Sequence, residues 1–91
     1  MLLRKDFRQP LYYENKNPLT GSDGNLRFAI EPVLKDADGN PIKKPKELLV
    51  TAWPGPYCRE ATDESLWQRS LFPLDEDGLN AAIAWLNSVE L

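Results

Sequence analysis

The clearest pattern of hydrophobic and polar positions lies at the end of the chain, in residues 71–91. Apolar residues recur there at the spacing of one helical face, which Trp85 widens: Leu79, Ala82, Ile83, Leu86 and Val89. Asp75 stands where an N-cap is needed, and Glu76 and Asp77 follow in the first turn, where the helix dipole favours negative charge. The pattern predicts an amphipathic helix whose apolar face is buried against a partner surface, most simply a sheet.

Two stretches in the middle of the chain are typical of strands. Residues 26–34 alternate with the two-residue period of a half-buried strand, although Pro32 interrupts the ladder and suggests an edge strand or a bulge. Turn signals follow in residues 38–41, and residues 47–53 are then rich in strand-forming side chains. We expect these two runs to pair as a hairpin.

A second hairpin is predicted between residues 57–61 and residues 66–72, across the polar turn at 62–65. The first twenty-five residues hold a short alternating stretch, residues 2–7, and a turn-rich segment, residues 14–25. They are expected to add an edge strand or to wrap the sheet.

The predicted fold class is therefore α+β. We expect a single domain over residues 1–91, in which a small antiparallel sheet of three to four strands is covered on one face by the C-terminal helix. Three tryptophans are expected to fill the core between sheet and helix: Trp53, Trp67 and Trp85.

Length and composition agree with a small folded domain. The 91 residues allow one modest core, and a hydrophobic content of 42% argues against disorder. A lone Cys58 cannot form an internal disulfide, and Arg4 and Lys5 follow Met1 too closely for an apolar signal-peptide core. No segment reaches the length of a membrane span. These features predict a cytoplasmic protein that does not associate with membranes.

The residue types disfavour catalysis. The chain has no histidine, which excludes Ser-His-Asp, Cys-His and imidazole-metal sites within it, and one cysteine cannot make a thiolate zinc site. Cys58 lies next to Arg59 but has neither a base nor a resolving thiol. Glu60, Asp63 and Glu64 could form an acid–base pair, although carboxylates near a turn are usually solvated. We expect a non-enzymatic protein without a cofactor.

One segment is similar to a calcium-binding loop. Residues 36–47 match an EF-hand at four ligand positions: Asp36, Asp38, Asn40 and Glu47. Pro41 stands where that loop needs glycine, and strand-like sequence flanks the segment. We therefore interpret it as a hairpin turn without a metal, and the basic run at 43–46 as a solvated loop.

Charge and aromatic residues suggest a binding surface. Residues 1–46 carry nine basic and six acidic side chains, whereas residues 47–91 carry two and eight, a distribution that suits a protein partner or head-to-tail self-association. The candidate interaction surface combines tyrosines near prolines with neighbouring cations: Tyr12, Tyr13, Tyr57, Arg4 and Arg8. The alternative is a nucleic-acid-associated accessory protein that stacks bases on these tyrosines, which the net charge of −3 disfavours.

Two segments carry a resemblance to known sequences. They are Trp53-Pro-Gly-Pro-Tyr57 with Glu60 and Thr62, and Phe72-Pro73 with Gly78-Leu79, Ala82-Ile83 and Trp85-Leu-Asn87. At these positions the chain resembles a group of small uncharacterised proteins carried on bacterial mobile elements. Such proteins sometimes bear an acetyltransferase label, but nothing here is similar to the glycine-rich pyrophosphate loop of the GNAT acetyltransferases, and the chain is too short for that complete fold. The resemblance implies a bacterial cytoplasm and an unknown function, and it transfers no active-site residue.

Overall fold

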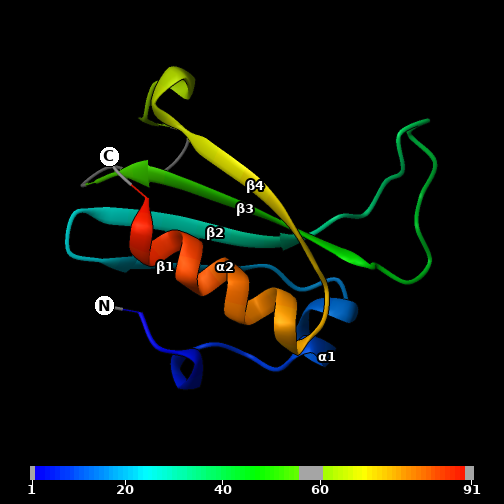
Figure 1. Ribbon diagram of the computed structural model, residues 1–91. Helices are drawn as coiled ribbons and strands as arrows, with labels where there is room; N and C mark the ends of the chain where they lie inside the picture. The colour runs from blue at the N-terminus through cyan, green and yellow to red at the C-terminus, as the bar shows by residue number, and fades with distance from the viewer. Residues whose placement is uncertain (1, 56–60, 90–91) are drawn as a thin grey trace.

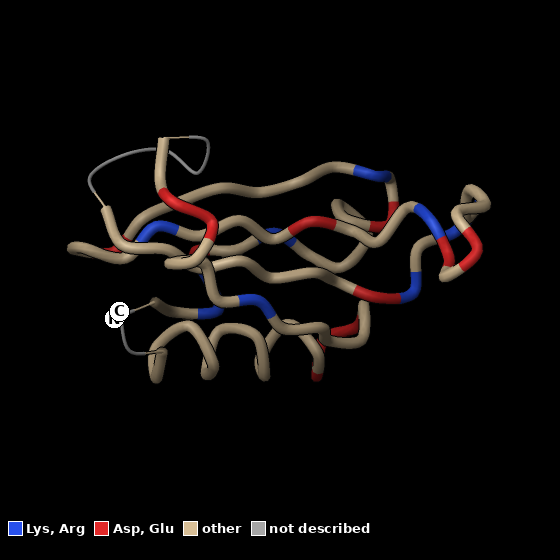
Figure 2. The backbone as a smooth tube through the Cα atoms, turned by 90° about the horizontal axis from the view of Figure 1, so that it is seen from above, with Lys and Arg blue, Asp and Glu red and all other residues tan. Residues whose placement is uncertain are grey.

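The chain forms a four-stranded antiparallel sheet with a helix packed across one face (Figure 1). The computed structural model describes residues 2–55 and 61–89. The strands lie side by side in chain order: β1 (Leu19–Asp23), β2 (Leu26–Pro32), β3 (Glu47–Pro54) and β4 (Gln68–Pro73). Helix α2 (Glu76–Ser88) follows directly and forms a second layer (Figure 2). The predicted α+β class and the C-terminal helix over an antiparallel sheet are confirmed.

Helix α2 begins where the capping pattern places it. The Asp75 carboxylate accepts a hydrogen bond of 2.6 Å from the Gly78 backbone N–H, which satisfies one of the free donors of the first turn. The predicted apolar face is the buried one, and the Trp85 ring packs against Phe72 with 6.1 Å between ring centroids. Neither described helix has both the length and the apolar character that a membrane crossing requires.

Gly78 allows the start of α2 to approach the end of β4 very closely. A Cβ atom on Gly78 would lie 2.7 Å from the carbonyl carbon of Pro73 and 2.9 Å from its Cγ, whereas ordinary contacts begin near 3.4 Å. The backbone of the helix therefore rests directly on the strand, at a position where only glycine fits.

Strands β2 and β3 form the predicted first hairpin. Pro32, however, ends β2 opposite Leu48, and β2 lies between β1 and β3, so the expected edge strand or bulge is wrong. The Pro32 nitrogen faces the side of β1, which starts opposite Ile30, so no ladder hydrogen bond is lost there. Leu34 lies beyond the strand and is 42% exposed.

Only one arm of the predicted second hairpin, residues 66–72, lies entirely within the described residues. β4 begins at Gln68 and pairs with β3, from Ala52 opposite Gln68 to Leu48 opposite Phe72. Residues 64–66 form a short 3-10 helix, η3 (Glu64–Leu66), in place of a turn and strand start. Residues 57–60 of the expected partner strand lie outside the described residues.

The first part of the chain both wraps the fold and adds an edge strand. Residues 2–7 are not a strand but contain η1 (Arg4–Asp6), and α1 (Pro10–Glu14) follows. Residues 2–14, which we call the N-terminal arm, are fastened to both ends of α2. Leu2 N–H donates to Asn87 Oδ1 over 2.9 Å and Asn87 Nδ2 donates to the Leu2 carbonyl over 3.0 Å, while Arg4 pairs with Glu76 at 2.6 Å.

The core lies between the sheet, α2 and the arm. It comprises Phe7, Tyr13, Leu26, Phe28, Ile30, Leu48, Val50, Ala52, Leu74, Leu79, Ala82, Ile83 and Leu86.

Of the three tryptophans expected in this core, only Trp85 packs against it. Trp53 is 5% exposed but alternates with Ala52 along β3, so it lies on the face turned away from α2. Trp67 is half-buried, with the Arg69 guanidinium 5.3 Å from its ring centroid. Arg69 pairs opposite Thr51 and therefore shares the face of Trp53. The expectation failed because β3 is buried on both faces, so its run of apolar residues does not show which side chains face α2.

Candidate functional site

Among the described residues, the structure does not bring the expected tyrosine and arginine side chains together as one exposed surface. Tyr13 is fully buried, so it cannot take part in a surface contact, and burial raises the pKa of its hydroxyl. That hydroxyl lies near the Arg8 backbone but makes no hydrogen bond of acceptable geometry with a described residue. Arg4 is held by Glu76 and also donates to the Phe7 carbonyl.

What remains of that surface is Arg8 and Tyr12. The Arg8 guanidinium lies 5.5 Å from the Tyr12 ring centroid, and the Tyr12 hydroxyl donates to the Pro18 carbonyl over 2.8 Å. Tyr12 is half-buried and contacts Tyr13 edge to face. Tyr57 lies outside the described residues.

The other candidate side chains serve local structure where they are described. Asp63 caps η3 by accepting from the Ser65 N–H, which holds the pKa of Asp63 below its ordinary value, and Glu64 pairs with Arg69 at 2.8 Å. Cys58, Arg59 and Glu60 lie outside the described residues.

The calcium-like segment is a turn. Asp36 Oδ1 accepts from the N–H groups of Asp38 and Asn40, each over 2.9 Å, and an isolated bridge joins Lys35 and Pro41. This is the side-chain turn that aspartate commonly makes with its own backbone. Within residues 2–55 and 61–89, no three acidic or thiol side chains gather as metal ligands would. The whole connection projects from the body of the molecule (Figure 1).

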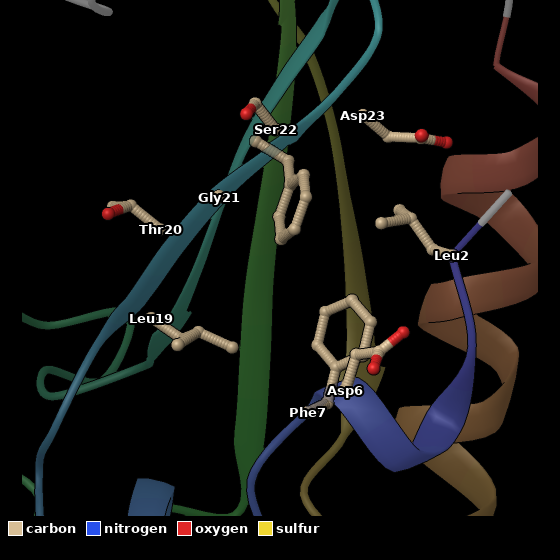
Figure 3. A pocket seen from close by; sticks show the side chains of 9 residues that line it. Leu2, Asp6, Phe7, Leu19, Thr20, Gly21, Ser22 and Asp23 are labelled. Atoms are coloured by element: carbon tan, nitrogen blue, oxygen red, sulfur yellow. The ribbon is translucent and has the colours of Figure 1, made fainter.

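A pocket of about 340 Å³ lies between β1 and the N-terminal arm (Figure 3). Leu2 and Phe7 line it from the arm and Leu19 from the strand, and their side chains turn toward the hollow, whereas Thr20 points away. The other lining residues are Asp6, Gly21, Ser22, Asp23 and Phe28. The pocket lining is therefore partly apolar and partly polar, and it includes two aspartates.

Gly21 gives the pocket its floor. It pairs opposite Phe28, and a Cβ on Gly21 would lie 2.7 Å from Phe28 Cζ, so the ring occupies the space a side chain would take. The Phe28 ring in turn lies 5.6 Å from that of Phe7, centroid to centroid. A side chain entering from outside would meet two aromatic rings.

The backbone of β1 beside this pocket is open. β1 and β2 are joined by the two-residue turn Gly24-Asn25, with Gly24 at φ 59°, so the closing pair Asp23 and Leu26 is hydrogen-bonded. Bonding alternates along an antiparallel pair, so the N–H and C=O groups of Thr20 and Ser22 point away from β2. Both residues are exposed, and no backbone hydrogen bond joins them to another described segment.

The opposite edge of the sheet is protected in a way that β1 is not. The Val33 N–H donates to the Glu47 carbonyl, which fixes how hydrogen bonding alternates along β3. By this alternation the backbone groups of Arg69, Leu71 and Pro73 in β4 point away from β3. Proline and charge at outward positions are a common defence against pairing with another chain. β1 carries neither at its outward positions.

The sequence interpretation missed this site because its parts come from two distant segments. The Gly24-Asn25 dipeptide, a two-residue hairpin signal ahead of an alternating run, could have located β1. No comparable signal ties residues 2–7 to that strand.

Comparison of the chain with protein-family models, with curated proteins and with solved structures finds no match.

Proposed function

We propose that the protein is a non-enzymatic interaction module that binds another protein by adding an extended segment of that partner to the edge of β1. The observation that carries this proposal is the pair of outward-facing backbone units at Thr20 and Ser22, beside a pocket that is lined in part by apolar side chains. In strand addition, main-chain hydrogen bonds supply affinity and pockets for alternate side chains supply specificity. β1 offers both on the same edge.

The nucleic-acid alternative is less well supported. Stacking needs exposed aromatic faces next to free cations, but Tyr13 is buried and Arg4 is paired with Glu76. A bacterial cytoplasmic location and the relation to mobile-element proteins stay predictions.

The test is an affinity capture from native bacterial lysate with three forms of the protein: wild type, Ser22→Pro and Ser22→Ala. Proline at Ser22 removes one outward N–H and leaves the ladder to β2 intact, because that ladder uses Gly21 and Asp23. Ser22→Ala removes the hydroxyl and keeps the N–H, so it is the matched control.

We expect the wild type and Ser22→Ala to recover the same nuclease-resistant protein partner and Ser22→Pro to lose it. Circular dichroism of all three forms establishes that the sheet is retained. Equal recovery by Ser22→Pro would refute binding at β1. Recovery abolished by nuclease in all three forms would favour the nucleic-acid alternative.

A further inference from the structure

We infer that the N-terminal arm controls the β1 site: a partner segment pairs with β1 while residues 2–7 of the arm are docked on α2, and it is released when they detach. This inference rests on the proposed function and concerns the regulation of the same site. It follows from what the arm contributes to the pocket and from how residues 2–7 are held.

The arm supplies one side of the pocket beside β1. Leu2 and Phe7 turn their side chains toward the hollow, and Asp6 also lines it (Figure 3). β1 and β2 supply the rest, including the Phe28 ring, which occupies the space of a side chain at Gly21. When residues 2–7 leave, the strand edge keeps its backbone groups but loses the pocket for a partner's side chain.

Polar contacts with the two ends of α2 hold residues 2–7 in place, and these contacts are exposed to solvent. Asn87 makes two hydrogen bonds with the Leu2 backbone, of 2.9 and 3.0 Å. The Arg4 guanidinium donates to both carboxylate oxygens of Glu76, over 2.6 and 2.9 Å, but the Glu76 side chain is 52% exposed. Solvent screens exposed pairs of this kind, so each contributes little to the stability of the docked arm.

Little apolar surface is buried by this part of the arm. Phe7 is the one buried residue among residues 2–8, and its ring lies 5.6 Å from that of Phe28, centroid to centroid. The burial of this ring is opposed by the conformational freedom that residues 2–7 regain when they detach. Segments with few buried apolar contacts and with exposed hydrogen bonds open locally before the whole fold does. Residues 2–7 therefore meet the conditions for a segment that opens and closes while the rest of the fold persists.

The far end of the arm stays anchored when residues 2–7 leave. Tyr13 in α1 is fully buried and belongs to the core. Arg8 and Gln9, which lie between Phe7 and α1, are exposed. Residues 2–7 can thus detach and return about this short connection, without loss of the sheet or of α2.

The coupling between the arm and the β1 site is reciprocal. A segment that binds the docked form alone shifts the equilibrium toward docking, and its apparent affinity falls with the fraction of docked protein. By linkage, arm docking and segment binding strengthen each other by the same factor. Occupation of β1 is therefore expected to slow amide hydrogen exchange in residues 2–7.

The test combines fluorescence anisotropy with amide hydrogen exchange resolved by residue in NMR spectra. The probe is the peptide Ser-Thr-Leu-Thr-Leu-Thr-Ser with an amino-terminal fluorophore and a blocked carboxyl end, whose two leucines share a face when the peptide is extended. The proteins are wild type, Ser22→Pro, the double variant Glu76→Gln with Asn87→Ala, and Ser88→Ala. Ser88→Ala is the matched control, because Ser88 is exposed on α2 and its hydroxyl donates within the helix, to the Trp85 carbonyl.

At a peptide concentration about ten times its dissociation constant, we expect exchange of the Asp6 and Phe7 amides to slow about tenfold in wild type. Both amides are hydrogen-bonded in the short helix η1, which is too short to persist once the arm has detached. The amides of Asp38 and Asn40, bonded in a turn that projects away from the site, should keep their rates (Figure 1).

The variants should separate docking from binding. Without peptide, the double variant should exchange the Asp6 and Phe7 amides about tenfold faster than wild type, because the arm loses hydrogen bonds at both ends of α2. It should bind the peptide more weakly by the factor by which its docked fraction falls. Ser88→Ala should match wild type in both measurements, and Ser22→Pro should bind no peptide and show no slowing.

The outcomes distinguish this inference from the proposed function. Peptide binding that Ser22→Pro abolishes, but that leaves exchange of the Asp6 and Phe7 amides unchanged in wild type, would overturn control by the arm and leave strand addition at β1 standing. Peptide binding that Ser22→Pro does not change would overturn strand addition itself. Absence of peptide binding to wild type at millimolar concentration would overturn both.

Discussion

Replacing Gly78 with alanine is expected to destabilise the fold, although alanine is the better helix former. In an ordinary helix interior, alanine is more favourable than glycine by about 1 kcal/mol. At Gly78 the new Cβ would lie 2.7 Å from the Pro73 carbonyl carbon and 2.9 Å from Pro73 Cγ, well inside contact distance. The carbonyl belongs to the backbone of β4, so no side-chain rotation can relieve the overlap.

The structure allows a rough magnitude for this change. Lifting the start of α2 off β4 opens a gap, and a gap of about 0.5–1 Å already forfeits a quarter to a half of the dispersion contact. Overpacking typically costs about 1–3 kcal/mol, and disturbing the Asp75 cap adds about 1 kcal/mol, against a gain of about 1 kcal/mol from helix propensity. We expect a net loss of about 1–3 kcal/mol in the free energy of unfolding.

Urea denaturation followed by tryptophan fluorescence measures this loss. Ala84→Gly is the control, because Ala84 is exposed on the same helix and should lose about 1 kcal/mol by propensity alone. We therefore expect the wild type to be more stable than either variant, Gly78→Ala or Ala84→Gly. A Gly78→Ala protein as stable as the wild type, or more stable, would show that α2 is not seated on β4 as described.

Three further changes test other contacts. Tyr13→Phe should raise the free energy of unfolding by about 1 kcal/mol, because it removes a buried hydroxyl without a hydrogen-bond partner among the described residues; a decrease in thermal stability would mean that the hydroxyl is bonded. Asn87→Asp removes the donor to the Leu2 carbonyl and should cost about 1 kcal/mol while speeding amide exchange in the N-terminal arm; unchanged exchange would show that the arm is held elsewhere. The hydrogen bond from Arg4 holds the pKa of Glu76 below its ordinary value of 4.5, so this stabilisation is present above that pH and is lost as the pH falls through the lowered pKa. Glu76→Gln should therefore flatten the acid part of the stability profile in denaturation at several pH values, and an unaltered profile would contradict the pairing.

The parts of the fold that could be predicted are those with local signals. α2 carries its cap at Asp75 and its apolar face within one segment, and the β2–β3 hairpin carries alternation on both sides of its turn residues. The partner of β4 could not be read locally, because β3 pairs with it across an intervening segment. The edge strand expected among the first twenty-five residues could not be placed at residues 19–23, since glycine, serine and aspartate are poor strand formers and pairing with β2 overrides that preference.

The candidate site was harder to predict than the fold. Its wall from the arm reaches β1 because Phe7 is buried in the core and because Asn87 and Glu76 hold the arm against α2, and these contacts join residues far apart in the chain. The prediction for Tyr13 was also wrong. This tyrosine follows a proline and an arginine and was expected at the surface, but it is buried in the core. The residue types around a tyrosine do not by themselves show whether it binds a partner at the surface or packs in the core of its own chain.

The order of the strands has a consequence for how the molecule forms. Each strand pairs with its neighbour in the chain, so the sheet can grow through short loop closures that cost little chain entropy and favour rapid folding. The arm instead must find Asn87 across nearly the whole chain, a closure that gains its contacts only when α2 is already in place. We expect the sheet and helix to assemble first and the arm to dock afterwards, so the pocket is completed at the end of folding and is the first feature lost when the arm detaches.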